Sequence, residues 1–502
     1  MKRITIDPIT RLEGHGKVEI FLGDNGEVEN VYLQIPELRG FEKFCIGRPV
    51  EELARITTQI CGVCPEAHHI ASSKAADAVY HVEPPAVGRK LRELFYSAFF
   101  VTDHATHFYI LGGPDFVVGP DSGPAERNII GLIGKVGREA GLKVINLRKS
   151  CHNVIKMMGG RSIHPVFSIP GGVSKAITEE ERQQIEDIAR TAVEFGKFTF
   201  KVFDDVVLKN SDYVKLITSD AYAHKTYYMG LVDKDNRINF YDGEVRVVDP
   251  DGKEFAKFPG KDYREHIAER VEPWTYLKFP YLKKVGWKGL VDGKDSGVYR
   301  ATPLSRCNAS EGPSTPLAQA EYKRMYETLG GKPIHATLAT HWARIVELMY
   351  AAERMLDLAT DSDVSRLARE VSARPNDRSL HTQVRTIPRE VPTEGVGVVE
   401  APRGTLYHHY VTDQNGIVKD VNLVVGTTNN NAAISMSLKK AARSVIKKDG
   451  KITEGALNLV EMAFRAYDPC FGCATHSLPG KMPLELTVRD SQGKVIAVKR
   501  SF

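Results

Sequence analysis

Two short motifs carry the residues with the most distinctive chemistry in this sequence. The segment QICGVCPEAHH places Cys61 and Cys64 near the start of the chain, and AYDPCFGCATH places Cys470 and Cys473 near its end. In each motif two residues separate the cysteines and a histidine follows them. Thiolates at this spacing can converge on one metal ion, so the two pairs together predict a single four-thiolate site.

The spacing alone leaves the kind of site open. Bringing the two distant pairs together costs about 5 kcal/mol of chain entropy, whereas a structural metal site supplies about 10–16 kcal/mol. Zinc remains an alternative, although zinc ribbons usually place their pairs within about 20 residues of each other. Either pair alone would also suit a disulfide or a redox CxxC. The isolated cysteines are expected to be plain buried thiols: Cys45, Cys151 and Cys307.

The composition is that of a globular protein large enough to bury such a site. The chain has 502 residues, of which 42% are hydrophobic and 26% charged, with a formal net charge of +5. Because the charges are well mixed, neither nucleic acid nor a membrane surface is indicated as a partner. The N-terminal residues contain no apolar stretch long enough for a signal peptide, so none is expected, and no segment approaches the about 18 apolar residues of a membrane span. The few cysteines suit a reducing compartment, so we expect a cytoplasmic protein.

Hydrophobic periodicity predicts the elements that position the two motifs. The β-rich runs around a GDNG turn in residues 18–35 indicate a hairpin. Apolar residues at spacings of three and four predict a long helix over 86–112 and another around 338–356. Further helices are expected over residues 178–208, 430–447 and 452–466, and a final hairpin is expected after them.

These elements predict an α+β fold that is predominantly helical, with a long-helix bundle core. The expected parts are an N-terminal β region (1–48), a first half of the helical core with Cys61 and Cys64 (49–210), an inserted β-containing lobe (211–300), a second half of the core with Cys470 and Cys473 (301–476) and a C-terminal extension (477–502). The two cysteine motifs should meet at the centre of this fold.

Together with several further segments, the motifs resemble the large, catalytic subunit of nickel–iron hydrogenases. The resemblance runs from about residue 3 to residue 498, and CATH with the following LPGKMPLELTVRD looks most like the cytosolic, coenzyme-linked branch. The matching segments stand in family order: DPITRLEGHGKVEI (7–20), ELRGFEKF (37–44), DHATHFYIL (103–111), GGRSIHP (159–165), EAPRGTLYHH (400–409) and TTNNN (427–431).

The resemblance implies a role for each cysteine in cleaving hydrogen. Cys61 and Cys470 would be terminal ligands of nickel, and Cys64 and Cys473 would also bridge to an iron that carries carbon monoxide and cyanide. H2 would be cleaved heterolytically and reversibly, with Cys470 as the base and Glu13 as the first relay carboxylate. By motif type alone Glu13 would be a salt bridge at the end of an element, so its role rests on the resemblance.

The resemblance also implies a polar cap over the metals. Arg403 would face a cyanide ligand or assist as a base, because a planar guanidinium offers a fork that lysine lacks. Asp103 and Asp468 would orient it, and Thr427 would hydrogen-bond a cyanide. From the residues alone, Asp468 before a proline is an ordinary turn signal. Asp103 lies within an apolar helix and needs a partner, for which Arg403 is the obvious candidate.

A second, hard-cation site is implied by Glu42 and His476, which match ligands of an ion that is usually magnesium. For Glu42, plain exposure is the ordinary alternative. His68 is expected either as a hydrogen-bonded neighbour of the cluster or as a ligand. The departures from the family pattern are Gln59 in place of arginine, Gly426 in place of proline or alanine, and His69 doubling the motif histidine.

The chain needs partners if it is an oxidoreductase. Its isolated cysteines cannot build an iron–sulfur cluster, and it has neither a GxGxxG unit nor a P-loop. The resemblance implies an iron–sulfur small subunit, further electron-transfer subunits, nickel chaperones and a maturation endopeptidase that cuts after His476. The alternative is a non-catalytic, zinc-bound structural or assembly subunit related to the quinone-site subunit of respiratory complex I.

Overall fold

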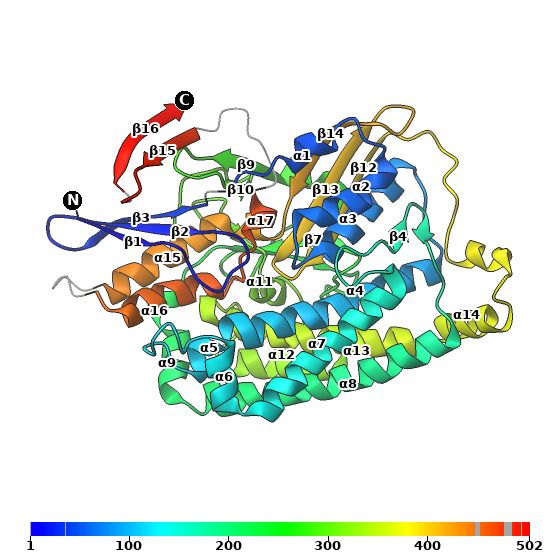
Figure 1. Cartoon of the computed structure of the whole chain (residues 1–502), viewed down its shortest axis with the longest axis horizontal. Coiled ribbons are helices and arrows are strands. Elements are labelled where there is room, and N and C mark those ends of the chain that lie inside the picture. Colours follow the sequence, from blue (N-terminus) through cyan, green and yellow to red (C-terminus); the bar gives the residue numbers. More distant parts are fainter. Residues whose placement is uncertain (1, 36, 447–451, 476–483, 493, 502) are drawn as a thin grey trace.

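A bundle of long helices forms one side of the molecule in this computed structural model, which describes residues 2–35, 37–446, 452–475, 484–492 and 494–501 (Figure 1). Helix α4 packs against α7 and α13, and α13 also packs against α8. The helices expected over 86–112, 178–208 and around 338–356 are confirmed. Their bounds are α4 Ala86–Thr106, α8 Glu179–Phe203 and α13 Thr340–Ala359, and the structure adds α7 Arg138–Gly159, which was not expected.

The spacing of apolar residues explains why α4 lies at the middle of this bundle. Leu91, Leu94 and Ala98 are fully buried, and so are Phe95 and Phe100 on the other faces of the helix. The helix then continues as a π-helical turn over His107–Gly112. Such turns are rare and often accompany functional sites, and this one begins one helical turn after Asp103.

The N-terminal β region is a three-stranded antiparallel sheet, and it confirms the hairpin expected over 18–35. Strands β1 (Lys2–Ile6) and β3 (Val28–Gln34) flank β2 (Lys17–Leu22). The sheet shares an apolar core with helices α15 (Asn431–Val445) and α16 (Glu454–Arg465), which match the helices expected there.

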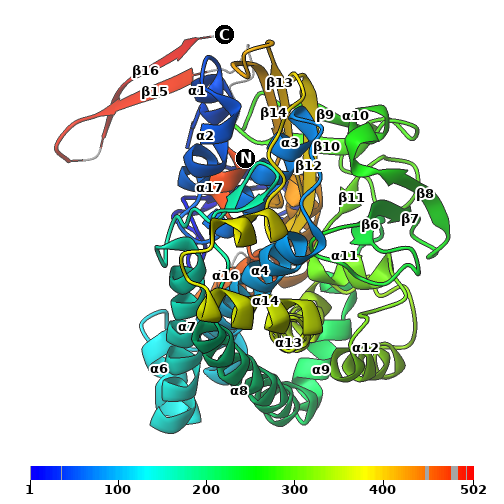
Figure 2. The same ribbon diagram turned by 90° about the vertical axis from the view of Figure 1, so that its right-hand side faces the viewer.

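Several strands lie within residues 211–300, where a β-containing lobe was expected (Figure 2). It contains a four-stranded sheet in the order β11, β6, β7, β8 and a separate antiparallel pair, β9 and β10. The bounds are β6 Tyr227–Val232, β7 Glu244–Val248, β8 Glu254–Pro259, β9 Ile267–Val271, β10 Lys278–Leu282 and β11 Tyr299–Arg300.

A third sheet lies in the region that was expected to be helical. Strands β12 (Glu394–Ala401), β13 (Gly404–Thr412) and β14 (Val418–Val424) are antiparallel, and α3 (Pro65–Val79) packs across β12. The close approach requires glycine, because a Cβ on Gly397 would lie 2.1 Å from the carbonyl oxygen of Ala71. These strands are buried over most of their length, and such apolar runs do not show the alternation that identifies a strand.

The final strands, β15 (Leu484–Arg489) and β16 (Val495–Ser501), form the antiparallel hairpin expected at the end of the chain. Figure 2 shows it projecting from the body of the molecule. No helix within the described ranges is sufficiently long and apolar to cross a membrane.

The shorter elements are α1 Phe41–Cys45, α2 Val50–Ile56, α5 Pro114–Val117, α6 Ile129–Val136, β4 Ser168–Ile169, β5 Gly172–Val173, α9 Ser211–Thr218, α10 Tyr263–His266, α11 Pro303–Asn308, α12 Pro316–Thr328, α14 Ser362–Ala373 and α17 Phe471–Ala474.

Candidate metal centre

The two cysteine motifs meet inside the protein, as the sequence predicted. The sulfur atoms of Cys61, Cys64, Cys470 and Cys473 are buried and all lie within 4.8 Å of one another. The Sγ atoms of Cys61 and Cys470 are 3.3 Å apart, and those of Cys64 and Cys473 are 3.4 Å apart. All four thiols are free, so neither pair forms a disulfide.

The first pair is positioned by its own loop and by the helix that follows. Cys64 is the N-cap of α3, and Pro65 begins that helix, where its missing N–H costs nothing. The backbone N–H groups of Val63 and Cys64 both donate to Cys61 Sγ, each at 3.2 Å. Although burial opposes ionisation, hydrogen bonds from the other cysteines and the charge of Arg403 hold the pKa of Cys61 well below its ordinary value.

The second pair depends on distant parts of the chain. Cys470 precedes α17, a helix of 4 residues, and pairs with Glu13 in an isolated parallel bridge. The N–H of Phe471 donates to the carbonyl oxygen of Glu13 at 3.0 Å. Arg39 joins the two motifs, because its Nη1 donates to Ile60 O at 2.5 Å and to Gly472 O at 3.2 Å.

Glu13 lies directly beside one of the sulfur atoms. Cys470 Sγ donates to Glu13 Oε2 at 2.9 Å, and the N–H of Gly472 donates to the same oxygen at 2.9 Å. Burial first, and then the charge of Cys61, raise the pKa of Glu13 above its ordinary value. A carboxylate with a raised pKa in contact with a thiol is able to exchange a proton with it.

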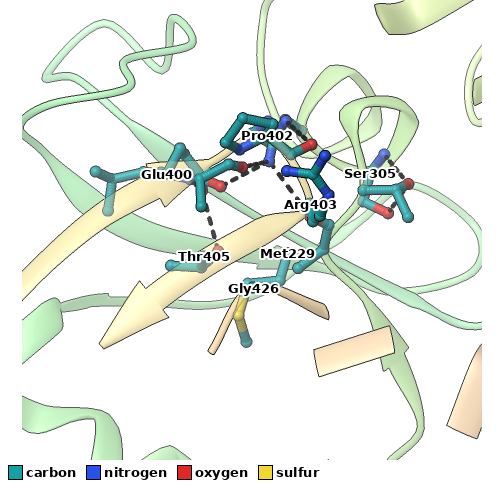
Figure 3. Close-up of polar contacts among 12 residues, drawn as sticks. Met229, Ser305, Glu400, Pro402, Arg403, Thr405 and Gly426 are labelled. Atoms are coloured by element: carbon teal, nitrogen blue, oxygen red, sulfur yellow. Dashed lines mark hydrogen bonds and ion pairs between the residues drawn. The ribbon is translucent and has the colours of Figure 1, made fainter. Parts of the chain in front are cut away.

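Arg403 lies in the turn between β12 and β13, next to Pro402 (Figure 3). Its Nη1 donates to Asp103 Oδ2 at 3.0 Å, and its Nη2 lies 2.8 Å from Asp468 Oδ2. All three side chains are buried. Asp468 has a φ of 54°, a left-handed conformation that aspartate tolerates better than most residues. The structure thus brings together the three residues that the resemblance placed over the metals.

Thr427 fastens the second cysteine motif through its hydroxyl group. Its Oγ1 accepts a hydrogen bond from the N–H of Cys470 at 3.1 Å. The preceding residue, Gly426, is not in loose backbone, because a Cβ added there would meet the carbonyl oxygen of Gly404 at 3.1 Å. Glycine at position 426 therefore allows the backbone before Thr427 to pack closely against the backbone of Gly404.

The two adjacent histidines have different surroundings. His68 Nε2 lies 3.4 Å from Cys473 Sγ, and its Nδ1 lies 3.1 Å from His408 Nε2. His69 turns away from the sulfur atoms: its Nδ1 donates to Ala54 O at 2.8 Å, and its Nε2 accepts from the N–H groups of Phe167 and Ser168. Of the two motif histidines, His68 is the one beside the cluster, as a hydrogen-bonded neighbour.

The remaining residues that the sequence singled out are Glu42, His476, Gln59 and the isolated cysteines. Glu42 Oε1 accepts from the N–H of Leu423 at 2.8 Å, whereas His476 lies outside the described residues. Gln59 lines a surface hollow of ≈ 570 Å³ together with Phe41 and Phe44. Cys45, Cys151 and Cys307 are buried, free thiols, as expected.

Sequence reasoning missed two arginines at this centre. Arg39 lies in a segment that matches the family, but no role was predicted for it. Arg344 lies on α13 among apolar residues and was not singled out. Arg344 Nη1 lies 3.4 Å from Asp468 Oδ2, and its side chain is completely buried. A charged residue inside an apolar helix needs a partner, which is the argument that singled out Asp103 and could also have found Arg344.

The residues present fit a soft, redox-active metal. Burial and the neighbouring sulfur atoms raise the pKa of Cys470 well above its ordinary value, so the thiols lose their protons together only if a cation shares the site. Sulfur donors favour nickel, iron or zinc over hard cations. Among the described residues, Asp103 Oδ1 and Arg403 Nε are buried without a hydrogen-bond partner, as expected of a site built for an additional group.

Known proteins are similar to this chain in sequence and in fold. The family model described as nickel-dependent hydrogenase matches residues 39–121 and 296–476, and a model described as HoxL-like matches residues 3–38. An iron-sulfur subunit of the F420-non-reducing hydrogenase of Archaeoglobus profundus is 49% identical over 502 residues, covering 100% of both chains. The beta subunit of the NAD-reducing hydrogenase HoxS of Cupriavidus necator is 36% identical over 510 residues and covers 99% of each chain.

A solved structure agrees with the sequence relatives. The crystal structure of an NAD+-reducing NiFe-hydrogenase in the H2-reduced state superimposes with a TM-score of 0.85 and 33% identity, covering 95% of this chain and 100% of that chain. The match extends over both cysteine motifs and nearly all of the fold, which favours the hydrogenase interpretation over a zinc-bound structural or assembly protein. The chain therefore belongs to the nickel-dependent hydrogenase family.

Proposed function

We propose that this hydrogenase catalytic subunit cleaves and forms H2 heterolytically at a nickel–iron centre held by its cysteines. Cys61 and Cys470 are assigned as terminal ligands of nickel, and Cys64 and Cys473 as ligands shared with iron. The observation that carries the proposal is the buried cluster of sulfur atoms within 4.8 Å of one another, with Glu13 in contact with Cys470. A structural zinc site would need the sulfur atoms but not this carboxylate.

The proton leaves along the shortest contact at the cluster. When bound, nickel and iron would activate H2 and take up the two electrons released as it becomes two protons. Cys470 Sγ receives a proton and passes it to Glu13 Oε2, which lies 2.9 Å away. Hydrogen-bond distance between donor and acceptor is the geometric requirement for such a transfer, and Glu13 meets it.

Arg403 and Thr427 would bind the diatomic ligands of the iron, proposed to be carbon monoxide and cyanide. Asp103 and Asp468 hold both terminal nitrogens of Arg403, so the guanidinium keeps a fixed position. Its Nε has no partner among the described residues and remains able to donate. Thr427 Oγ1 accepts from the backbone of Cys470, which leaves its own hydroxyl hydrogen available to a cyanide.

Electrons would leave to a small subunit that carries iron–sulfur clusters, and from there to further electron-transfer subunits. Val63, between the two cysteines of the first motif, is 37% exposed, and Phe44 is 55% exposed. Phe44 also lines the surface hollow beside Gln59. Exposed apolar side chains around such a hollow are typical of a contact with another protein, so we propose that the small subunit binds there. The relative that reduces NAD supports a soluble, coenzyme-linked acceptor, and we propose a cytoplasmic location.

Maturation and a second cation complete the proposal. Glu42, together with His476, would hold a magnesium ion or another hard cation. Nickel chaperones would deliver the metal, and an endopeptidase would then cut after His476 and release the C-terminal extension.

The test is the metal content of the chain purified from its native host with its partners. We expect nickel and at least one iron per chain, a mass that ends at His476, and infrared bands of carbon monoxide and cyanide. One zinc per chain, with the extension still attached, would contradict the proposal.

A further inference from the structure

A second buried guanidinium lies behind the one that faces the centre. Arg344 Nη1 lies 3.4 Å from Asp468 Oδ2, the same oxygen that Arg403 Nη2 approaches at 2.8 Å. The Arg344 side chain is 0% exposed and that of Asp468 is 2% exposed. One carboxylate oxygen is therefore held between two arginines, only one of which is bound to Asp103 as well.

Arg344 also contacts the backbone of both segments that carry these residues. Its Nη1 donates to Pro402 O at 3.4 Å, and its Nη2 donates to Ala466 O at 3.4 Å. Pro402 directly precedes Arg403 in the turn between β12 and β13 (Figure 3), and Ala466 lies just before Asp468. Arg344 thus ties the turn that carries Arg403 to the segment that carries Asp468.

The same Nη1 of Arg344 also meets a buried hydrogen-bond chain. Arg344 Nη1 lies 3.4 Å from His104 Nδ1, and His104 Nε2 lies 3.0 Å from Glu347 Oε2. Burial lowers the pKa of His104 to about 4, so its neutral ring donates to Glu347 and accepts from Arg344. Arg306 binds both oxygens of Glu347 at 2.6 Å and reaches Glu400 at 2.8 Å.

A contribution to the stability of the fold does not explain why Arg344 is buried here. The hydrogen bonds of the Arg344 guanidinium are all long, at 3.4 Å. Its Nε has no partner among the described residues. Arg92 shows how the same core pairs an arginine for stability: it binds both oxygens of Asp77 and two backbone carbonyls. A loosely paired buried cation is unfavourable compared with an apolar side chain, and such exceptions concentrate at functional sites.

We propose that Arg344 is a positioning residue for the hydrogenase reaction. It holds Asp468 and the Pro402 turn so that Arg403 keeps one orientation toward the metal centre. The inference rests on the proposed function, because it takes Arg403 as the group that faces the iron ligands. Arg344 acts on Arg403 only through Asp468 and the Pro402 turn.

The test compares Arg344→Gln with the wild type in the complete, metal-loaded complex. We expect unchanged nickel and iron content, a shift or broadening of the infrared bands of the iron-bound carbon monoxide and cyanide, and a kcat lowered about tenfold with little change in KM for H2. Arg344→Lys retains the charge without the fork and should give a smaller change of the bands. The matched control is Arg92→Lys, which should leave the bands unchanged.

A double-variant comparison separates positioning from general damage. If Arg344 acts through Asp468 and the Pro402 turn, Arg344→Gln should shift the bands less in the Asp468→Asn background than in the wild type. Independent, additive shifts would overturn the inference, and so would wild-type bands in a fully loaded Arg344→Gln complex. Should Arg344→Gln fail to assemble, the Arg344→Lys bands decide in the same way. A wild type without nickel and iron would instead overturn the proposed function.

Discussion

The two halves of the cysteine cluster are built in different ways. In the first half, Cys64 caps α3, a helix of 15 residues, and Cys61 accepts hydrogen bonds from its own loop. In the second half, α17 has only 4 residues, and Cys470 is held by Glu13 and Thr427 from distant segments. The first half is preorganised by local structure, whereas the second forms only when the fold is complete. Metal binding then joins the two halves.

Removing a sulfur atom should have the largest effect, and it should be equal for the two halves. For Cys61→Ser and Cys470→Ser we expect hydrogen turnover to be abolished and nickel content to fall at least about tenfold, because a hydroxyl is a poor ligand for a soft metal. Nickel is measured by mass spectrometry of the purified complex. Cys151→Ser, which replaces another buried thiol, is the control and should retain nickel. Full nickel in either cluster variant would contradict the ligand assignment.

Replacing Glu13 should show whether the second half of the cluster can bind nickel without supporting hydrogen turnover. Glu13→Gln keeps an acceptor for the N–H of Gly472 but loses the proton-carrying group, so we expect hydrogen turnover to fall about a hundredfold with nickel retained. The measurement is H2 uptake together with nickel content. Glu19→Gln in strand β2 is the matched control and should retain activity. Loss of nickel in Glu13→Gln would reassign Glu13 to a structural role.

The first half should carry a pH dependence of stability of its own. Burial lowers the pKa of His69 to about 4, below its value in the unfolded chain. As the pH falls from about 6.5 to about 4, the unfolded state binds the proton first, so about 3 kcal/mol of stability is lost across that window. Urea denaturation at several pH values measures the loss. His69→Gln should show a shallower decline, and an identical decline would contradict this origin.

Arg39 links the two halves, and its removal should have the smallest of these effects. Arg39→Gln loses the hydrogen bonds to Ile60 and Gly472, which should lower the free energy of unfolding by about 1–2 kcal/mol because the side chain is only half-buried. Thermal denaturation of the metal-loaded complex measures it. Arg55→Gln, an exposed arginine on α2, should cause no loss. Equal losses for the two variants would show that Arg39 is not a link.

Periodicity and residue type predicted the long helices, the first hairpin and the meeting of the cysteines. Leu91, Leu94 and Ala98 recur on one face of α4 because a packed helix requires it. The sheet of β12, β13 and β14 was missed, because buried strands lack the alternation that identifies a half-exposed strand. Arg344 was missed for a related reason: its partners come from the β12–β13 turn and from the segment before α17.

The sequence by itself determined the sulfur donors, the likeness to the family and the long-helix core, since these depend on residue type and on spacing along the chain. Only the tertiary structure decided that His68 faces the cluster while His69 faces the backbone of Phe167 and Ser168. It also decided that Arg344 and Arg403 share one oxygen of Asp468. Such contacts join residues far apart in the chain, and their geometry follows from how the helices and sheets pack.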